Sequence, residues 1–225
     1  RQLGEMLKEH WDLVLECGCR PESRRLIEAS GWPFVVIDAG VPIPPSSAAN
    51  CCGRISIAID RALGECIRTC VRRNVRRVVQ FHLEGSCFDA ASRMRQVGME
   101  VESIRIPFCD SLERIAMCAL RQTKKFLSRR RHSLPDLIFI SDDQVARGVL
   151  TELLARGVRV PEETQVVTLS NRGFGVLWPT SITRLEMDPK EHGMAVAKAS
   201  IAFLETGSFS PNPVLGSVWK RGKTF

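Results

Sequence analysis

No continuous apolar stretch in the chain reaches the roughly 18 residues that a transmembrane helix needs, which excludes a membrane-spanning helix. The first residues, RQLGEMLKEHW, are charged and have no apolar centre, so they do not form a secretory signal. They already show helical spacing, with Leu3, Met6 and Leu7 on one side. We therefore expect the chain to begin inside a domain.

Paired cysteine spacings, which mark a disulfide framework, are also missing. The cysteines number nine, an odd count, and Cys51 and Cys52 are adjacent. Free thiols in a reducing cytoplasm are the simplest interpretation. A zinc site needs two spaced cysteine pairs or a Cys/His set, whereas the four histidines, at positions 10, 82, 132 and 192, are scattered. We expect no bound metal and no cofactor.

Recognisable catalytic motifs are absent as well. The sequence has no GxSxG, no Walker loop and no HExxH. Ser47 and Cys87 have no evident base partner that would make either a nucleophile. We expect a protein that is not an enzyme. An enzyme on a doubly wound fold stays as an alternative, which turnover on sugar phosphates would reveal.

The composition is that of a globular protein with a substantial core. The chain has 225 residues, of which 44% are hydrophobic and 25% charged. Its net charge of +7 comes mainly from helix-like stretches such as RTCVRRNVRR and RQTKKFLSRRRH. Such a charge is typical either of solvated helix faces or of contact with nucleic acid or membrane, and the charge alone does not decide between them.

Apolar segments alternate with helix-like segments along the chain. The expected strands are residues 11–16, 33–38, 55–60, 76–82, 99–106, 137–141, 164–170 and 181–187, with a further one in 213–225. The expected helices are residues 1–10, 22–30, 61–74, 87–97, 111–127, 143–155 and 190–204, and residues 39–53 form a loop. Apolar strands separated by helices predict parallel sheets covered on both faces. The fold class is therefore α/β, doubly wound, with two sheets.

Polar or aromatic residues follow several of these strands. In such folds ligands bind beyond the carboxyl ends of the strands, so these residues are the first candidates for a site. They include Glu84, Phe108, Asp142 with Asp143, and Ser170 with Asn171.

Several segments together resemble the lactose/galactose-repressor (LacI/GalR) family of transcriptional regulators. The most specific are PDLIFISDDQVARGVLTELLARGVRVPEETQVVTLSN (135–171) and WPTSITRLEMDPKEHGMAVAKASIAFLETG (178–207). PFVVID, ISIAIDRALG, RNVRRVVQFH and the final VWKRGKTF are also similar to family segments. The resemblance covers nearly the whole chain, except that the family's first strand–helix unit and DNA-binding headpiece would precede Arg1.

The resemblance implies two Rossmann-like lobes of the type I periplasmic-binding-protein kind, with a ligand cleft between them. The amino-terminal lobe would hold residues 1–59 and 174–207, and the carboxyl-terminal lobe residues 60–173 and 208–225. Such lobes close on a small molecule in a switching motion. The implied function is an effector-binding and dimerisation domain, in which a sugar-like molecule modulates binding of operator DNA.

The resemblance also implies roles for individual residues. Asp143 matches a ligand-contacting Asp, although it could instead be the N-cap of the helix that follows. Phe108 matches an aromatic that stacks on the effector, although a strand-end Phe is also ordinary core. Ser170 and Asn171 replace an acidic pair, and Asp142 stands where the family often has Asn. Arg20 could reach the cleft or lie in solvent.

Ser86 is the informative departure, because the family commonly has an Arg there that clamps sugar oxygens. The absence of this Arg favours an altered ligand, polar and even cationic, or a regulator that has lost its small-molecule response. A second hypothesis is a solute-binding protein that delivers a sugar to a transporter. The nine cysteines and the pI near 9.1 favour the regulator.

Overall fold

The computed structural model describes residues 2–17, 21–38, 48–84, 90–129, 133–209 and 214–225. The chain divides into two compact units. Unit 1 holds Arg1–Ala58 and Asp188–Gly216, and unit 2 holds Ile59–Met187 and Ser217–Phe225. In the expected lobes, residues 174–187 belonged to the first lobe. They lie in unit 2 instead, because the strand Thr183–Met187 hydrogen-bonds to the strand Gln165–Asn171. Residues 208–216, expected in the carboxyl-terminal lobe, belong to unit 1, where Val214–Gly216 pair with Ser56–Ala58.

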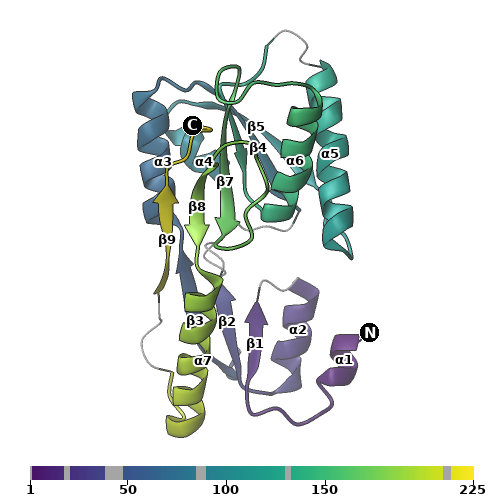
Figure 1. The fold of residues 1–225 in the computed structure, drawn as a ribbon. Helices are drawn as coiled ribbons and strands as arrows, with labels where there is room; N and C mark the ends of the chain where they lie inside the picture. Colours follow the sequence, from purple (N-terminus) through teal and green to yellow (C-terminus); the bar gives the residue numbers. More distant parts are fainter. Residues whose placement is uncertain (1, 18–20, 39–47, 85–89, 130–132, 210–213) are drawn as a thin grey trace. The chain divides into compact units, whose positions relative to one another are not determined.

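Unit 1 is built on parallel strands in the order β1 (Val14–Cys17), β2 (Phe34–Asp38), β3 (Cys51–Ala58) and the start of β9 (Val214–Lys220) (Figure 1). Its helices are α1 (Gln2–Met6), α2 (Pro21–Ser30) and α7 (Pro189–Thr206). Alternate side chains of β2 serve two small cores. Phe34 and Val36 pack with Ile27, and Val35 packs with Ile55.

The strand β3 is longer than the sequence predicts and ends earlier. It begins at Cys51, which lies opposite Phe34 of β2, so part of the expected loop is strand. Asp60, expected at the end of this strand, is the first residue of α3. The backbone pairing with β2 extends the strand through Cys-Cys-Gly-Arg, a stretch without an apolar pattern.

Unit 2 contains a larger sheet with the strand order β5-β4-β6-β7-β8-β9. Its strands are β4 (Arg77–Leu83), β5 (Glu100–Ile106), β6 (Leu137–Ile140), β7 (Gln165–Asn171), β8 (Thr183–Met187) and the end of β9. All are parallel except β9, which runs antiparallel to β8. The mainly parallel α/β class expected from the sequence is confirmed.

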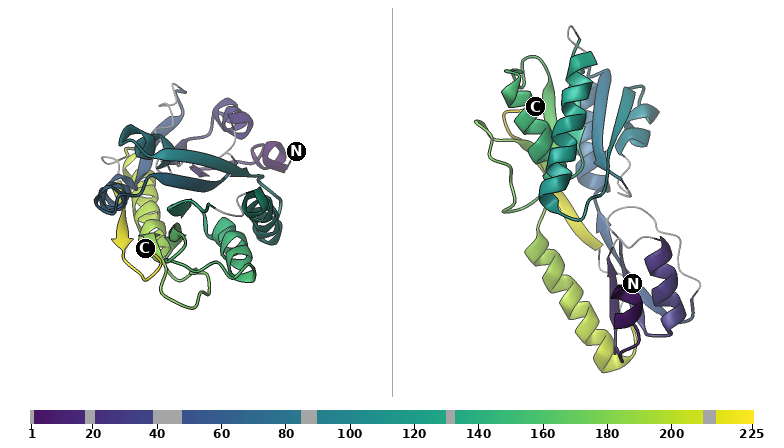
Figure 2. Two further views of the ribbon diagram at one scale, coloured as in Figure 1. Left: turned by 90° about the horizontal axis from the view of Figure 1, so that it is seen from above. Right: turned by 90° about the vertical axis from the view of Figure 1, so that its right-hand side faces the viewer.

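Four helices cover the two faces of this sheet: α3 (Asp60–Arg72), α4 (Ala90–Gln96), α5 (Leu112–Arg129) and α6 (Asp143–Ala155). α5 and α6 lie on one face, and α3 and α4 on the other (Figure 2). The chain goes from β4 outward to β5, and after β6 it continues in the opposite direction to β7. This reversal creates a switch point between β4 and β6, where α/β folds commonly bind ligands.

Close packing of α5 on α6 depends on Gly148. A Cβ atom at this position would lie 2.1 Å from the carbonyl oxygen of Ala116 and 2.7 Å from the Cβ of Ala119. The two helices then share one core with the central strands; its fully buried members include Phe81, Ile138, Ile140, Val149 and Leu153. This core fixes the start of α6 against the carboxyl end of β6.

The basic stretches lie on exposed helix faces. Arg68 and Arg72 of α3 and Arg121, Lys124 and Lys125 of α5 are all exposed. Among the described residues, no helix is long and apolar enough to cross a membrane.

Candidate functional site

The doublet Asp142–Asp143 follows a completely buried strand, β6. Ser141 continues the contact with β4, because its backbone N–H and its hydroxyl both donate to the carbonyl oxygen of Phe81. Asp142 is then the N-cap of α6. Its Oδ1 accepts hydrogen bonds from the backbone N–H groups of Gln144 at 2.7 Å and Val145 at 3.0 Å. The capping role considered for Asp143 therefore belongs to Asp142, and Asp143 is the first residue of the helix.

The carboxylate of Asp143 is turned toward the end of β7. Asn171 donates both its backbone N–H and its side-chain Nδ2–H to Asp143 Oδ2, each at 3.0 Å. The other oxygen, Oδ1, is buried and accepts no hydrogen bond from any described residue. Burial raises the pKa of this carboxyl, the hydrogen bonds from Asn171 lower it, and the charge of Asp142 raises it again, with a net rise.

A cavity of about 140 Å³ lies beside this carboxylate. It is enclosed by the start of α6, strands β7 and β8 and the connection between these strands; its lining residues are Asp143, Ala146, Thr168, Ser170, Gly175, Val176, Thr180, Ser181, Ile182 and Arg184. Ser170 Oγ is buried and, like Asp143 Oδ1, has no hydrogen-bond partner among the described residues. Buried polar atoms normally have partners, so two in the wall of one cavity make it the candidate site for a polar molecule.

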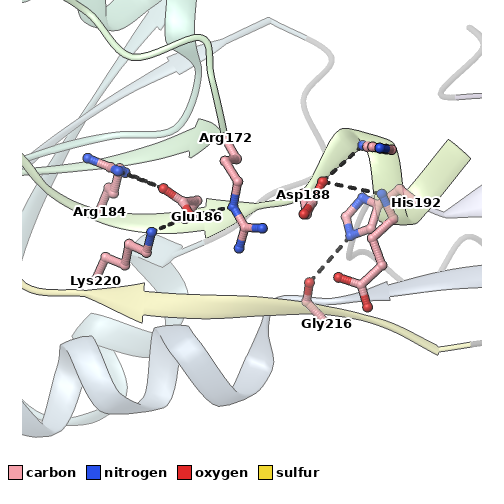
Figure 3. A network of polar contacts seen from close by, with 9 residues as sticks. Arg172, Arg184, Glu186, Asp188, His192, Gly216 and Lys220 are labelled. Carbon is pink, nitrogen blue, oxygen red and sulfur yellow. Dashed lines mark hydrogen bonds and ion pairs between the residues drawn. The ribbon is translucent and has the colours of Figure 1, made fainter.

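Arg184 connects this cavity to an ion cluster centred on the buried carboxylate of Glu186. Glu186 Oε2 accepts from Arg184 Nε at 2.8 Å, while Oε1 accepts from Arg172 Nε at 3.0 Å and Lys220 Nζ at 2.8 Å (Figure 3). The Glu186 side chain is only 1% exposed. Burial alone would raise the pKa of Glu186, but the hydrogen bonds from Lys220, Arg172 and Arg184 lower it to about 2. Glu186 therefore stays ionised and holds the Arg184 guanidinium in place beside the cavity.

Residues 70–224 match a protein family described as the periplasmic binding protein-like domain. This segment is well over half of the 225-residue chain.

The chain belongs to the periplasmic binding protein-like domain family.

Solved structures of transcriptional regulators share the fold of this family member. A LacI family regulator from Arthrobacter sp. FB24, in complex with lactose, is 19% identical with a TM-score of 0.74, over 98% of this chain and 81% of that one. The regulator CelR in complex with cellobiose is 16% identical with a TM-score of 0.76, over 100% and 69%. The Lac repressor bound to ONPG is 15% identical with a TM-score of 0.72, over 99% and 67%. At identities this low the TM-scores show a common fold and no more, and the periplasmic-binding-protein-like fold that the resemblance implied is confirmed.

No curated protein matches the sequence significantly.

The predicted site residues of this periplasmic binding protein-like domain fall into four groups. Asp143 and Ser170 line the cavity, and Asn171 and Asp142 support it through a hydrogen bond to Asp143 and the cap of α6. Glu84, after β4, and Phe108, after β5, do not line it. Phe108 is 56% exposed, so the alternative that it is ordinary core is wrong. Ser86 and Arg20 lie outside the described residues.

Sequence reasoning missed Arg184 and Thr168, and also the lining residues Gly175, Val176, Thr180, Ser181 and Ile182 between β7 and β8. A search limited to the carboxyl ends of strands does not reach Arg184, which lies near the start of β8, opposite Thr168. A signal was nevertheless present. In TRLEM, Arg184 and Glu186 are two residues apart, so they share one face of a strand, where a charged pair indicates a buried ion pair. Among the described residues, no group of three or more His, Cys, Asp or Glu side chains could hold a metal ion.

Proposed function

We propose that this chain is the effector-binding domain of a DNA-binding transcriptional regulator, and that a small polar molecule binds at the carboxyl ends of β6 and β7. The observation that carries the proposal is the buried carboxylate of Asp143, which offers an oxygen without a partner in the wall of a cavity that Ser170 also lines. The family membership and the fold shared with regulators support it.

The effector would be a molecule rich in hydroxyl or amine donors, such as a sugar or another polar metabolite. An ionised carboxylate only accepts hydrogen bonds, whereas a serine hydroxyl can accept or donate. Fold neighbours were solved with lactose and with cellobiose. Ligand pockets in proteins typically have volumes of about 300–1,000 Å³. The cavity, of about 140 Å³, is smaller, so it would hold one hydroxylated end of the effector.

Regulation would follow from a difference in effector affinity between two conformations of the domain. An effector that binds both conformations equally well does not change their populations. Operator DNA would be bound through a headpiece outside these 225 residues, in a cytoplasmic homodimer. The transporter solute-binding alternative gains no support from these fold neighbours, which are regulators.

A thermal-shift screen tests the proposal. The panel contains lactose, cellobiose, other sugars, polyols and hydroxylated amines. A ligand at one hundred times its Kd stabilises the native state by about 2.7 kcal/mol, so a true ligand raises the melting temperature in proportion to the logarithm of its concentration.

Two variants locate the effect. Asp143→Ala should abolish the shift. Asp60→Ala is the matched control, because Asp60 is likewise the first residue of its helix but its side chain is 84% exposed. A shift that survives in Asp143→Ala contradicts the assigned site. A panel in which no compound shifts the wild type contradicts the proposed ligand class.

A further inference from the structure

Two cysteines outside the candidate site lie in contact. Cys109 belongs to the segment that joins β5 to α5, and Cys118 is in the second turn of α5. Their Sγ atoms are 3.7 Å apart and share a hydrogen bond, and both side chains are half-buried. Neither residue takes part in the proposed effector site. The pair therefore needs an explanation of its own.

The two sulfur atoms are at van der Waals distance from each other. An S–S bond is about 2.05 Å long, so the two sulfur atoms, now 3.7 Å apart, must approach each other by about 1.7 Å. Residues 107–109 have no regular secondary structure, and the Sγ of Cys109 also donates a weak hydrogen bond of 3.5 Å to the carbonyl oxygen of Pro107. A rotation of the Cys109 side chain and a small shift of this segment can close the gap without unwinding α5.

The pair is accessible to a small reagent. Cys109 and Cys118 both line a surface pocket of about 620 Å³. Cys118 also lines an adjoining groove of about 660 Å³, whose charged lining residues are all basic: Arg121, Lys124, Lys125 and Arg129. Such a groove raises the local concentration of small anions. A small disulfide that carries carboxylates, such as glutathione disulfide, suits both the charge and the size of this entrance.

We propose that Cys109 and Cys118 form a reversible intramolecular disulfide by exchange with a small anionic disulfide of the glutathione type. One protein thiol loses its proton to solvent and attacks a sulfur of the reagent, which forms a mixed disulfide and releases one glutathione thiolate. The second protein thiol, also deprotonated, attacks the protein sulfur of the mixed disulfide and releases the second thiolate. Both thiolates take up protons. The two cysteines are oxidised, and the reagent is reduced to two thiols.

The reaction should be slow at neutral pH and faster as the pH rises. Burial and the contact with Cys118 raise the pKa of Cys109, so little of the reactive thiolate is present. The charged groups around the pair are Asp110, Glu113, Arg114 and Arg121. Of these, Asp110 raises the pKa of Cys109 and Arg114 lowers it.

Cys66 and Cys70 provide an internal control. They are one helical turn apart on α3, and each is 0% exposed. An external disulfide cannot reach either sulfur in the folded protein. A link between them in the same sample would indicate unfolding and not the proposed site.

Peptide mapping tests the proposal. The chain is incubated with glutathione disulfide, quenched in acid and digested with trypsin, which cleaves after Arg105, Arg114 and Arg121. Oxidation joins the peptides IPFCDSLER (106–114) and IAMCALR (115–121) into one species, which a thiol reductant separates again. Cys109→Ser and Cys118→Ser should each abolish this species and leave the remaining thiol as a glutathione adduct.

Two outcomes would overturn the inference. One is the persistence of both thiols as single glutathione adducts in the wild type with no joined peptide. The other is a joined peptide that appears only together with a Cys66–Cys70 link. The inference does not rest on the proposed function, since it needs no effector, and each can fail without the other.

Discussion

Replacement of Glu186 by Gln should destabilise the protein at neutral pH. Glu186 is a single buried carboxylate that receives hydrogen bonds from Arg172, Arg184 and Lys220. Gln keeps the shape and removes the negative charge, so three cationic groups remain around a neutral amide. The cations are partly exposed (side-chain exposures of 53% for Arg172, 31% for Arg184 and 46% for Lys220), so water can solvate them once the carboxylate is gone, which limits the cost.

The magnitude follows from the pKa. Lowering the pKa of Glu186 from 4.5 to about 2 corresponds to at most about 3 kcal/mol of stability at neutral pH, and solvent screening of the partly exposed cations reduces this value. Because the folded-state pKa is the lower one, this stability is fully present above pH 4.5. It is lost as the pH falls from 4.5 toward 2, where the native carboxylate takes up its proton. The difference between wild type and Glu186→Gln should therefore shrink over this range.

Urea unfolding at several pH values, followed by circular dichroism, measures this difference. Glu163→Gln is the control, because Glu163 also has a lowered pKa through hydrogen bonds from Arg159, but its ion pair is exposed. Its substitution should change stability far less. Equal unfolding midpoints for Glu186→Gln and wild type at neutral pH would refute the reasoning, and so would a difference that stays constant down to acid pH.

Further substitutions test the supports of the cavity. Asp142→Ala should cost about 1 kcal/mol in urea unfolding through loss of the α6 cap, whereas Asp142→Asn should cost little, since Asn also caps. Gly148→Ala should lower stability by about 1–3 kcal/mol, because the new Cβ meets Ala116 of α5. Gly64→Ala, in the helix α3 with room for a Cβ, should instead raise it by up to about 1 kcal/mol. Asp143→Asn should gain stability relative to wild type as the pH rises above 3.8, since the raised pKa of Asp143 makes its ionisation unfavourable in the native state. A relative stability that does not change with pH would contradict the burial of this charge.

The sequence predicts the architecture well because parallel strands buried on both faces leave continuous apolar runs. LIFI of β6 is an example, and every residue in it is buried. The start of β3 could not be predicted in this way. Its Cys51, Cys52 and Gly53 are held as strand by pairing with β2, a contact between residues distant in sequence.

The candidate site was predicted in part. Asp143, Ser170 and Asn171 could be identified because each follows or ends a parallel strand, and these ends meet at one edge of the sheet. The sequence could not show which of the two adjacent acids caps α6, since both are Asp and Asp suits the N-cap position. The backbone angles decide it, with Asp142 extended and Asp143 already helical.

Arg184 was missed because it lies near the start of β8, whereas the residues considered were those at the carboxyl ends of the strands.

Amide hydrogen exchange with and without the compound that gives the largest thermal shift tests the central claim most directly. The measurement reports where on the chain the molecule binds. We predict slower exchange in residues 141–146 and 168–184, which contain the start of α6, the end of β7 and the segment that closes the cavity, and no such slowing in Asp143→Ala. Slowing confined to other segments, or unchanged in Asp143→Ala, would contradict a ligand site at the buried carboxylate of Asp143.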